Sequence, residues 1–555
     1  MLLPNIKSKE SAAAQLKIFG GLDRRDKISD TSFTEMENMS ADSAPALAPR
    51  SARCEIAEVP GAESITAPQY TDGALSSFTG VRENHFYYNG VQIKGVLSDG
   101  QKSITDFNGK ICIFPDKVYY DYIPSSDSGE VSDSLTSMES TMTLSGAVFY
   151  SSKNELSGEY TAYISSSGTS FAESFKIGDS LVISGCSKEK NNTHILESRL
   201  DRAADDDIVS AVVSAAQTGK IYLQLYNKHG EKVCFVSATE TGSITLKKAI
   251  PDMDHICVHN NRLWGTASSG EYIYASKLGD CTDFNSFAGL STDSWYSYVA
   301  TGGDFTGICS YRTAVVAFKR NYIHHVYGDA PVNFSIPKQT FGGCIDGRSI
   351  CEIGGVLYYL APDGFRAYSG GEPYDISPQL NLKYSSCAAG TDGIHYYASA
   401  FLDDGTCDVL VYTPEKNIWV REDSTPFADF CSFNGCVYGI ADGKMWRLGC
   451  AGSEGFTWSA VSKRFTYDII NHKGLSCMWI RADMDSGAEM SVYISADGGE
   501  FVSCGAICGS EGFSVYRIPV RFKKCNSFRI KLVGHGKAII HDIEITSHNG
   551  GRVYG

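Results

Sequence analysis

Short apolar runs, each broken by a turn and followed by a second apolar run, recur along the chain. Examples are ITDFNGKICIF from Ile104, HICVHNNRLWG from His255, SICEIGGVLYYL from Ser349 and DFCSFNGCVYGI from Asp429. Asn and Gly at the break supply the positive φ angles that tight hairpin turns require. The pattern therefore predicts β-hairpins, and several are followed by a further strand, such as GEYIYASKL from Gly270.

The hairpins recur with a regular period. Equivalent positions in four of the hairpins are marked by Cys257, Cys309, Cys351 and Cys431. The first three follow one another at intervals of about 40 to 50 residues, and the last interval is about twice 40. A period near 40 residues is typical of four-stranded propeller blades. One small twisted sheet cannot bury both of its faces, whereas a ring of such sheets packs them against one another. We expect an all-β fold with a β-propeller of six or seven blades. Serial β-sandwiches with similar hairpin spacing are the alternative.

Two stretches depart from this period. FAESFKIGDSLVISGC from Phe171 is typical of the opening of a small β-barrel, in which Gly178-Asp179 turns the chain. Long alternating segments near the C-terminus predict an antiparallel β-sandwich. The expected organisation is an extended N-terminal arm at 1–55, first propeller blades at 56–145, an inserted small β-barrel at 146–250, the remaining blades at 251–452 and a C-terminal β-sandwich at 453–555.

Composition narrows the classes of function. The 555 residues carry a net charge of −15, which disfavours a large phosphate-binding surface. Neither a secretory signal nor a run of about 18 apolar residues is visible, so no membrane span is expected. The 18 cysteines lack zinc-site spacing and are interpreted mostly as small buried apolar residues of a protein made in a reducing cytoplasm, with disulfides as the minority interpretation.

Catalytic and metal-binding motifs are not found. The sequence has no GxSxG, HExxH, Walker or strand-linked GxGxxG motif. His324-His325 lies in a strand-like segment, where neighbouring side chains face opposite ways, and Asp403-Asp404 lies in a turn context. The acidic run at 201–207 is interpreted as a solvated loop rather than a Ca²⁺ site. We therefore expect no catalytic residue, cofactor, metal or enzymatic activity. A glycosidase remains the enzyme alternative, because the separation of its carboxylates is set only in three dimensions.

The N-terminal stretch 16–50 shows neither a helical period nor strand alternation. It contains Gly20-Gly21-Leu22, an ENM segment and a Pro-x-Leu-x-Pro-Arg ending, and it resembles the N-terminus of the phage tail nozzle family, also called tail tubular protein B. NNRLWGTASSGEYIYASKLGDCTDFNSF from Asn260 and YRIPVRFKKCNSFRIKLVG from Tyr516 are further counterparts. The chain is shorter than typical nozzles. The matching residues are Phe19, Gly20, Gly21, Leu22, Asn38, Leu47, Pro49 and Arg50.

The resemblance implies a structural protein of a bacteriophage tail. It implies a six-fold homo-oligomeric ring whose propeller forms the wall of the DNA exit channel, assembled in the host bacterial cytoplasm and located in the virion tail. Its partners would be the portal, adaptor or other tail proteins, with transient, non-specific contact to genomic DNA. The eight matching residues are the candidate assembly interface. A host-glycan-binding tail adhesin and a glycosidase-like propeller are the alternatives.

Overall fold

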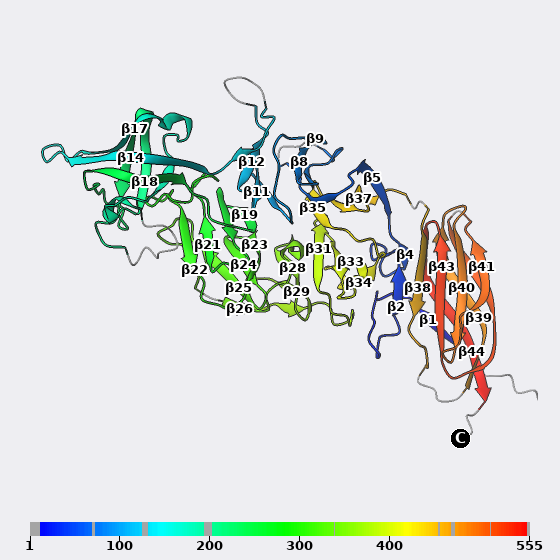
Figure 1. The fold of residues 1–555 in the computed structure, drawn as a ribbon. Coiled ribbons are helices and arrows are strands. Elements are labelled where there is room, and N and C mark those ends of the chain that lie inside the picture. The colour runs from blue at the N-terminus through cyan, green and yellow to red at the C-terminus, as the bar shows by residue number, and fades with distance from the viewer. Residues whose placement is uncertain are drawn as a thin grey trace, which may run out of the picture. The chain divides into compact units, whose positions relative to one another are not determined.

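The computed structural model describes residues 11–68, 73–124, 131–193, 203–337, 339–452, 455–467, 472–510 and 512–551. The described residues form β-strands and short 3-10 turns without an α-helix (Figure 1). The prediction of an all-β fold is therefore confirmed. None of the described segments forms a helix of the length and hydropathy that crossing a membrane requires.

The chain folds into two compact units. The first comprises Met1–Pro60, Ala74–Ser76 and Cys351–Gly555, and the second comprises Gly61–Gly73 and Ser77–Ile350. The N-terminal segment therefore belongs to the same unit as the C-terminal part of the chain.

The second unit contains four four-stranded sheets in which consecutive strands pair antiparallel. The first strand of each sheet lies against the first strand of the next sheet, as successive propeller blades require. The four sheets consist of β6 (Ala62–Ile65), β7 (Gly80–Arg82), β8 (His85–Tyr88) and β9 (Val91–Gln92); β10 (Ser103–Phe107), β11 (Lys110–Phe114), β12 (Val118–Asp121) and β13 (Thr136–Ser137); β19 (His255–His259), β20 (Arg262–Thr266), β21 (Tyr272–Ala275) and β22 (Trp295–Tyr298); and β23 (Phe305–Tyr311), β24 (Ala314–Lys319), β25 (Tyr322–Tyr327) and β26 (Gln339–Phe341).

The hairpin turns have the backbone geometry that the sequence indicates. Asn108 and Gly109, between β10 and β11, have φ angles of 51° and 87°. Asn260 and Asn261, between β19 and β20, have φ angles of 48° and 55°. Two successive residues in the left-handed region form a turn whose twist matches that of the flanking strands. Asn and Gly adopt this region at low cost, so the turn residues set the register of these hairpins.

The second unit also contains the inserted domain. Five strands form a closed barrel in the order β14-β15-β17-β16-β18. Phe149, Ile164, Ile183 and Ile221 are among its fully buried core residues. The predicted small β-barrel is thereby confirmed. Its strands are β14 (Ser140–Lys153), β15 (Tyr160–Ser170), β16 (Ser180–Ser184), β17 (Ser210–Tyr226) and β18 (Ala238–Lys248).

The first unit contains three further four-stranded sheets. The first strands of these sheets are again neighbours, β27 with β31 and β31 with β35. The strands are β27 (Cys351–Ile353), β28 (Val356–Ala361), β29 (Gly364–Tyr368) and β30 (Tyr374–Asp375); β31 (Ser386–Thr391), β32 (Tyr396–Phe401), β33 (Cys407–Thr413) and β34 (Ile418–Arg421); and β35 (Asp429–Phe433), β36 (Cys436–Ala441), β37 (Lys444–Cys450) and β5 (Ala52–Glu58).

The last of these sheets joins two distant parts of the chain. Its fourth strand, β5, comes from the N-terminal segment and pairs antiparallel with β37. A disulfide between Cys54 and Cys450, separated by 396 residues, links the same two strands. One disulfide among 18 cysteines agrees with the interpretation that disulfides are the minority. Of the other sixteen cysteines, only Cys508 is exposed.

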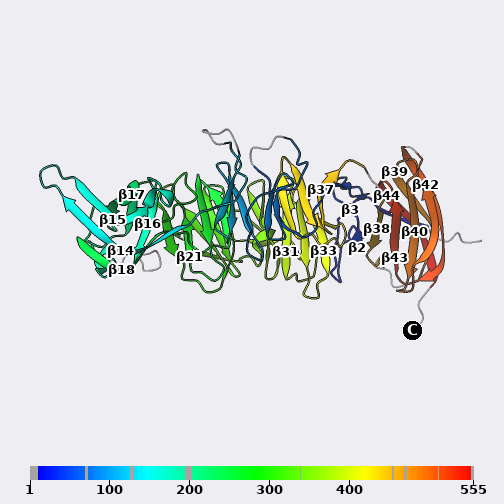
Figure 2. The same cartoon turned by 45° about the horizontal axis from the view of Figure 1, so that its top comes forward.

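The C-terminal part of the first unit is a β-sandwich of two sheets (Figure 2). The sheets have the orders β1-β44-β39-β42 and β2-β38-β43-β40-β41. Trp458, Met478, Ile480 and Val492 are fully buried. The strands are β1 (Ser11–Leu16), β2 (Phe33–Glu37), β38 (Thr457–Ser462), β39 (His472–Met484), β40 (Glu489–Ala496), β41 (Val502–Cys508), β42 (Phe513–Cys525), β43 (Phe528–His535) and β44 (Ala538–Gly551).

The N-terminal segment differs from the separate extended arm expected at 1–55. Its strands β1 and β2 are edge strands of the two sandwich sheets, β1 beside β44 and β2 beside β38. Its strand β5 completes a four-stranded sheet. The physical reason is that an isolated extended segment leaves its backbone amides and carbonyls without partners, whereas sheet edges supply them.

Candidate functional site

The eight residues singled out in the sequence lie mostly inside their own unit. Phe19, Leu22 and Leu47 are almost completely buried. Gly21 has a φ of 82°, and a Cβ built on it would lie 2.5 Å from the carbonyl oxygen of Trp419. The amide of Leu22 donates to that same oxygen over 2.8 Å. The Gly20-Gly21-Leu22 sequence therefore lets the backbone lie directly on strand β34.

Asn38 and Arg50 fix the two ends of a small hairpin. Asn38 accepts a hydrogen bond from Nε of Arg50 over 2.8 Å and donates from Nδ2 to the carbonyl oxygen of Thr457 over 2.9 Å. Asn38 has a φ of 56°, a conformation that Asn tolerates better than most residues. The hairpin between them consists of β3 (Met39–Ser40) and β4 (Ala48–Pro49).

Ion pairs of Arg50, at the end of the hairpin, and of Arg53, in β5, connect this part of the chain to the loop that follows β34. Nη2 of Arg53 lies 2.6 Å from Glu422, and Nη1 of Arg53 lies 2.8 Å from Asp423. Arg50 lies 3.7 Å from each of these carboxylates and stacks over the ring of Phe456 at 4.2 Å. Burial opposes ionisation of Asp423, but the Arg53 charge and the hydrogen bonds from Thr425 and Arg53 together outweigh it and lower the pKa of this carboxyl. Arg50 therefore has a structural role within the chain.

The loop of the hairpin is held from two sides. Nζ of Lys416 donates to the carbonyl oxygens of Ala41 and Asp42 over 2.9 and 2.8 Å. On the other side, Leu47 and Ile540 exchange backbone hydrogen bonds of 2.9 and 2.8 Å. Leu47 thus connects the hairpin to β44 of the sandwich. A loop restrained at both edges presents its side chains in a fixed arrangement, which lowers the entropic cost of binding a ligand.

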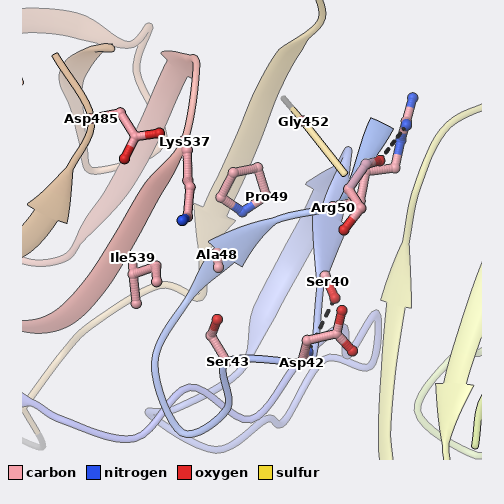
Figure 3. A pocket seen from close by; sticks show the side chains of 11 residues that line it. Ser40, Asp42, Ser43, Ala48, Pro49, Arg50, Gly452, Asp485, Lys537 and Ile539 are labelled. Atoms are coloured by element: carbon pink, nitrogen blue, oxygen red, sulfur yellow. Dashed lines mark hydrogen bonds between the residues drawn. The ribbon is translucent and has the colours of Figure 1, made fainter. Parts of the chain in front are cut away.

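A pocket of about 410 Å³ lies between this hairpin and the end of the sandwich (Figure 3). The hairpin supplies one wall, and the turns before β40 and before β44 supply the other. The volume lies within the range of roughly 300 to 1,000 Å³ typical of small-molecule sites. The lining residues are Ser40, Asp42, Ser43, Ala48, Pro49, Arg50, Ser51, Gly452, Asp485, Lys537 and Ile539.

The polar side chains of this pocket include both hydrogen-bond donors and hydrogen-bond acceptors. The Lys537 side chain extends toward Pro49 and Ala48, while the Arg50 guanidinium points away from Lys537 (Figure 3). Among the described residues, no carboxylate lies within ion-pair distance of Nζ of Lys537. Asp42 and Asp485 supply carboxylate acceptors. Ser40, Ser43 and Ser51 add hydroxyl groups that can donate or accept, so the pocket can satisfy a ligand that carries both kinds of polar group.

Asp42 is held in place by an imidazole. Nε2 of His395 lies 2.9 Å from Oδ1 of Asp42, and Nδ1 of His395 lies 2.8 Å from Oδ2 of Asp392. Burial works against protonation of His395, but hydrogen bonds to Asp392 and Asp42 raise its pKa to about 9. The hydrogen bond from His395 lowers the pKa of Asp42. At neutral pH the pocket therefore presents an ionised, oriented carboxylate.

The other residues considered in the sequence do not join this pocket. His324 and His325 are buried in β25, where burial lowers the pKa of His324 to about 4. Asp404 accepts from the amide of Thr406 over 2.9 Å within a turn. The first two residues of the acidic run 201–207 lie outside the described residues. No cluster of three or more metal-ligating side chains occurs within the described part of the chain.

Sequence reasoning located only part of the pocket. Pro49 and Arg50 are among the eight matched residues, whereas Asp42, Asp485 and Lys537 were missed. Asp42 lies in the stretch that the sequence singled out, and its polar neighbours Ser40 and Ser43 were the available signal. Asp485 and Lys537 lie in turns of the sandwich that carry no recognisable motif. They come close to the hairpin only through the fold.

No protein-family model and no curated protein matches the chain. Among solved structures, the exo-β-1,3-galactanase from Phanerochaete chrysosporium with galactose matches at 11% identity and a TM-score of 0.22, covering 52% of this chain and 95% of that chain. A family 29 carbohydrate-binding module from Piromyces equi matches at 13% identity and a TM-score of 0.14, covering 21% of this chain and 73% of that chain. Similarity at this level carries no argument about function by itself.

The comparison nevertheless corrects one expectation. The sequence predicts no enzymatic activity, whereas the structures that match over half of this chain include galactanases, which are glycoside hydrolases. The prediction that the protein is not an enzyme is therefore withdrawn. The physical reason for the error is that paired carboxylates leave no local motif in a sequence.

Proposed function

We propose that this protein binds a carbohydrate in the pocket between the β3–β4 hairpin and the sandwich. The observation that carries the proposal is the lining of the pocket, about 410 Å³ in volume. It combines the oriented carboxylate of Asp42 with a second carboxylate, several hydroxyls and Lys537, which has no ion-pair partner among the described residues. A pyranose offers hydroxyl groups that donate and accept at once, and such a ligand uses every polar group of this lining. A lipid or an aromatic metabolite would leave these groups desolvated without partners.

The electrostatics favour a sugar over a plain anion. Asp42 and Asp485 place two carboxylates in the pocket, and Lys537 places a cation there. The second cation of the lining, Arg50, lies near Glu422 and Asp423 and points away from Lys537. Sugar hydroxyls can accept from Lys537 and also donate to both acids, whereas a phosphate dianion or a sulfate carries no hydrogen-bond donor for the two carboxylates.

A glycan array probed with the full-length protein tests the proposal. We expect binding to at least one oligosaccharide class, weakened by Asp485→Asn and unchanged by Glu500→Gln, which alters an exposed carboxylate elsewhere in the sandwich. Chromatography of the bound oligosaccharide after incubation with the protein shows whether it is also cleaved. Equal binding by Asp485→Asn and wild type, or no binding to any glycan, would argue against the pocket.

We further propose that the seven four-stranded sheets outside the sandwich are blades of a β-propeller, four of them in the second unit and three in the first. Support comes from each unit separately, because in both of them the first strands of successive sheets are neighbours. The N-terminal strand β5 completes the sheet of β35–β37, the arrangement by which a propeller joins its last blade to its first. An experimental structure of the intact chain tests this, and an open row of sheets would contradict it.

A second candidate function is the structural role in a phage tail that the sequence resemblance implies. One observation favours assembly with further copies: the hairpin formed by β14 and β15 presents Leu156 at its tip, completely exposed, and Val148 and Tyr150 are also exposed. Mass photometry tests the idea. A closed homo-oligomer that dissociates on Leu156→Ser substitution supports it, and a monomer at micromolar concentration contradicts it.

A further inference from the structure

The outer face of one sandwich sheet carries an exposed tryptophan. Trp479 in β39 is 38% exposed, whereas its chain neighbours Met478 and Ile480 are fully buried. Side chains alternate between the two faces of a strand, so Trp479 points away from the sandwich core. A large aromatic side chain on the solvent side of a sheet leaves its ring open to contact with a ligand, and the groups around it decide what that ligand can be.

The strand register places Trp479 in a row of functional groups. Across the sheet β42-β39-β44-β1, Trp479 is opposite Arg517 on one side and Glu544 on the other, and Glu544 is opposite Gln15. Residues directly opposite each other share a face. The row therefore consists of the Arg517 guanidinium, the Trp479 indole, the Glu544 carboxylate and the Gln15 amide, in this order. It extends over about 14 Å at the usual spacing between strands.

A second row lies one pleat along the strands. Arg481 is opposite Val515 and Asp542. Nη1 of Arg481 lies 3.1 Å from Oδ2 of Asp542, and Nε2 of Gln15 donates to Glu544 over 2.6 Å. Arg517 lies over the Trp479 ring at 5.7 Å. These contacts hold the planar polar groups in place beside the aromatic ring.

We propose that this face, formed by Trp479, Arg481, Arg517, Asp542, Glu544 and Gln15, is a second carbohydrate-binding site, separate from the pocket. One face of a pyranose is lined by C–H groups that pack on an indole, and its rim carries hydroxyls. On this sheet the indole is flanked by donors on Arg481 and Arg517 and by acceptors on Asp542 and Glu544. The row across four strands suits a linear polysaccharide that crosses the sheet.

The same features disfavour a second copy of the chain as the occupant. Strand β42 lies at the edge of its sheet. It carries Pro519, which has no amide hydrogen to donate, and the exposed Arg517 and Arg521. Proline and cationic side chains on an edge strand prevent pairing with another sheet edge. Beside Trp479 the face carries the Arg481–Asp542 ion pair. It also carries the charged groups of Arg517 and Glu544 and one exposed apolar neighbour, Val515. A protein interface would bury these charged groups at a desolvation cost.

Affinity electrophoresis in gels containing β-1,3-galactan, dextran or alginate tests this inference, which rests on the proposed carbohydrate-binding function. We expect one of these polysaccharides to retard the wild type, with at least a tenfold weaker effect on Trp479→Ala and an intermediate effect on Trp479→Phe. Tyr374→Ala removes an exposed aromatic side chain from β30 and is the matched control, with no expected change. Trp479 is the exposed tryptophan among the described residues, so binding should also shift the intrinsic fluorescence of the wild type.

The outcomes separate this inference from the proposed function. If Trp479→Ala is retarded like the wild type while Lys537→Ala loses oligosaccharide binding, the inference is overturned and the pocket stands. If Trp479→Ala loses retardation while Lys537→Ala retains it, the second site is supported on its own. If Trp479→Ala instead converts a dimer into a monomer in sedimentation and no polysaccharide retards the wild type, the face is a self-interface and the inference fails.

Discussion

Nε2 of His395 lies 2.9 Å from Oδ1 of Asp42, and this ion pair connects the sheet β31–β34 to the loop that lines the pocket. His395 is protonated when folded, because its pKa is raised to about 9. In the unfolded chain an imidazole has a pKa of roughly 6.5. The stability that the folded state gains from this proton is therefore fully present below about pH 6.5 and is lost as the pH rises toward 9.

We predict that the hairpin loosens between pH 6.5 and 9. The loss is on the order of 2 kcal/mol, a discounted value because Asp42 is partly exposed to solvent. Hydrogen exchange of residues 39–49, measured across this range, should show falling protection in the wild type. The His395→Gln variant should be less protected at pH 6.5 and should change little with pH. A wild-type profile as flat as that of His395→Gln would contradict this role of the ion pair.

The disulfide between Cys54 and Cys450 should stabilise the sheet formed by β35, β36, β37 and β5. Cross-linking residues that are far apart in sequence restricts the unfolded chain, typically by 2–4 kcal/mol. We expect Cys54→Ser to lower the urea midpoint and to abolish any effect of a reducing agent. Cys508→Ser, which removes an exposed free thiol, is the control. If reductant leaves the wild-type midpoint unchanged, the bond does not contribute.

Gly21 should be intolerant of a side chain. Alanine there meets both a φ of 82° and a steric clash, because its Cβ would lie 2.5 Å from the carbonyl oxygen of Trp419. Gly393 has a similar φ of 90° with nothing within 4 Å of its Cβ position. Gly393→Ala therefore measures backbone strain alone, roughly 1–2 kcal/mol. Gly21→Ala should cost more and should make the segment 16–37 sensitive to limited proteolysis, and equal behaviour of the two variants would contradict the packing described for Gly21.

Local patterns predicted the parts of this fold that are set by neighbouring residues. The hairpin of β10 and β11 follows from Asn108-Gly109, and the barrel was expected from its strand pattern around Gly178-Asp179. Pairing between distant strands was not predictable, because an edge such as that of β37 accepts any strand that presents the right pattern. Hence β5 was assigned to an arm, and Cys54 and Cys450 could not be picked from 18 cysteines.

The residues of the pocket also come together through pairing between distant strands, so the sequence could not predict them as a group. Phe19, Leu22 and Leu47 were chosen as an assembly interface, and the sequence could not distinguish a neighbouring subunit from the chain's own sandwich and sheets. Their role in assembly stays a prediction. Asp485 and Lys537 became visible only when β1 and β2 placed the hairpin beside the sandwich turns.

The most direct test of the proposed function is the affinity of the pocket for the oligosaccharide that an array identifies. Isothermal titration calorimetry should compare the wild type with Lys537→Ala and with Lys27→Ala, which removes an exposed lysine of the same unit. A hydrogen bond from a charged group contributes roughly 1.5–3 kcal/mol, so Lys537→Ala should weaken binding about 10- to 100-fold, while Lys27→Ala should bind like the wild type. Equal affinities for all three proteins would contradict carbohydrate binding in this pocket.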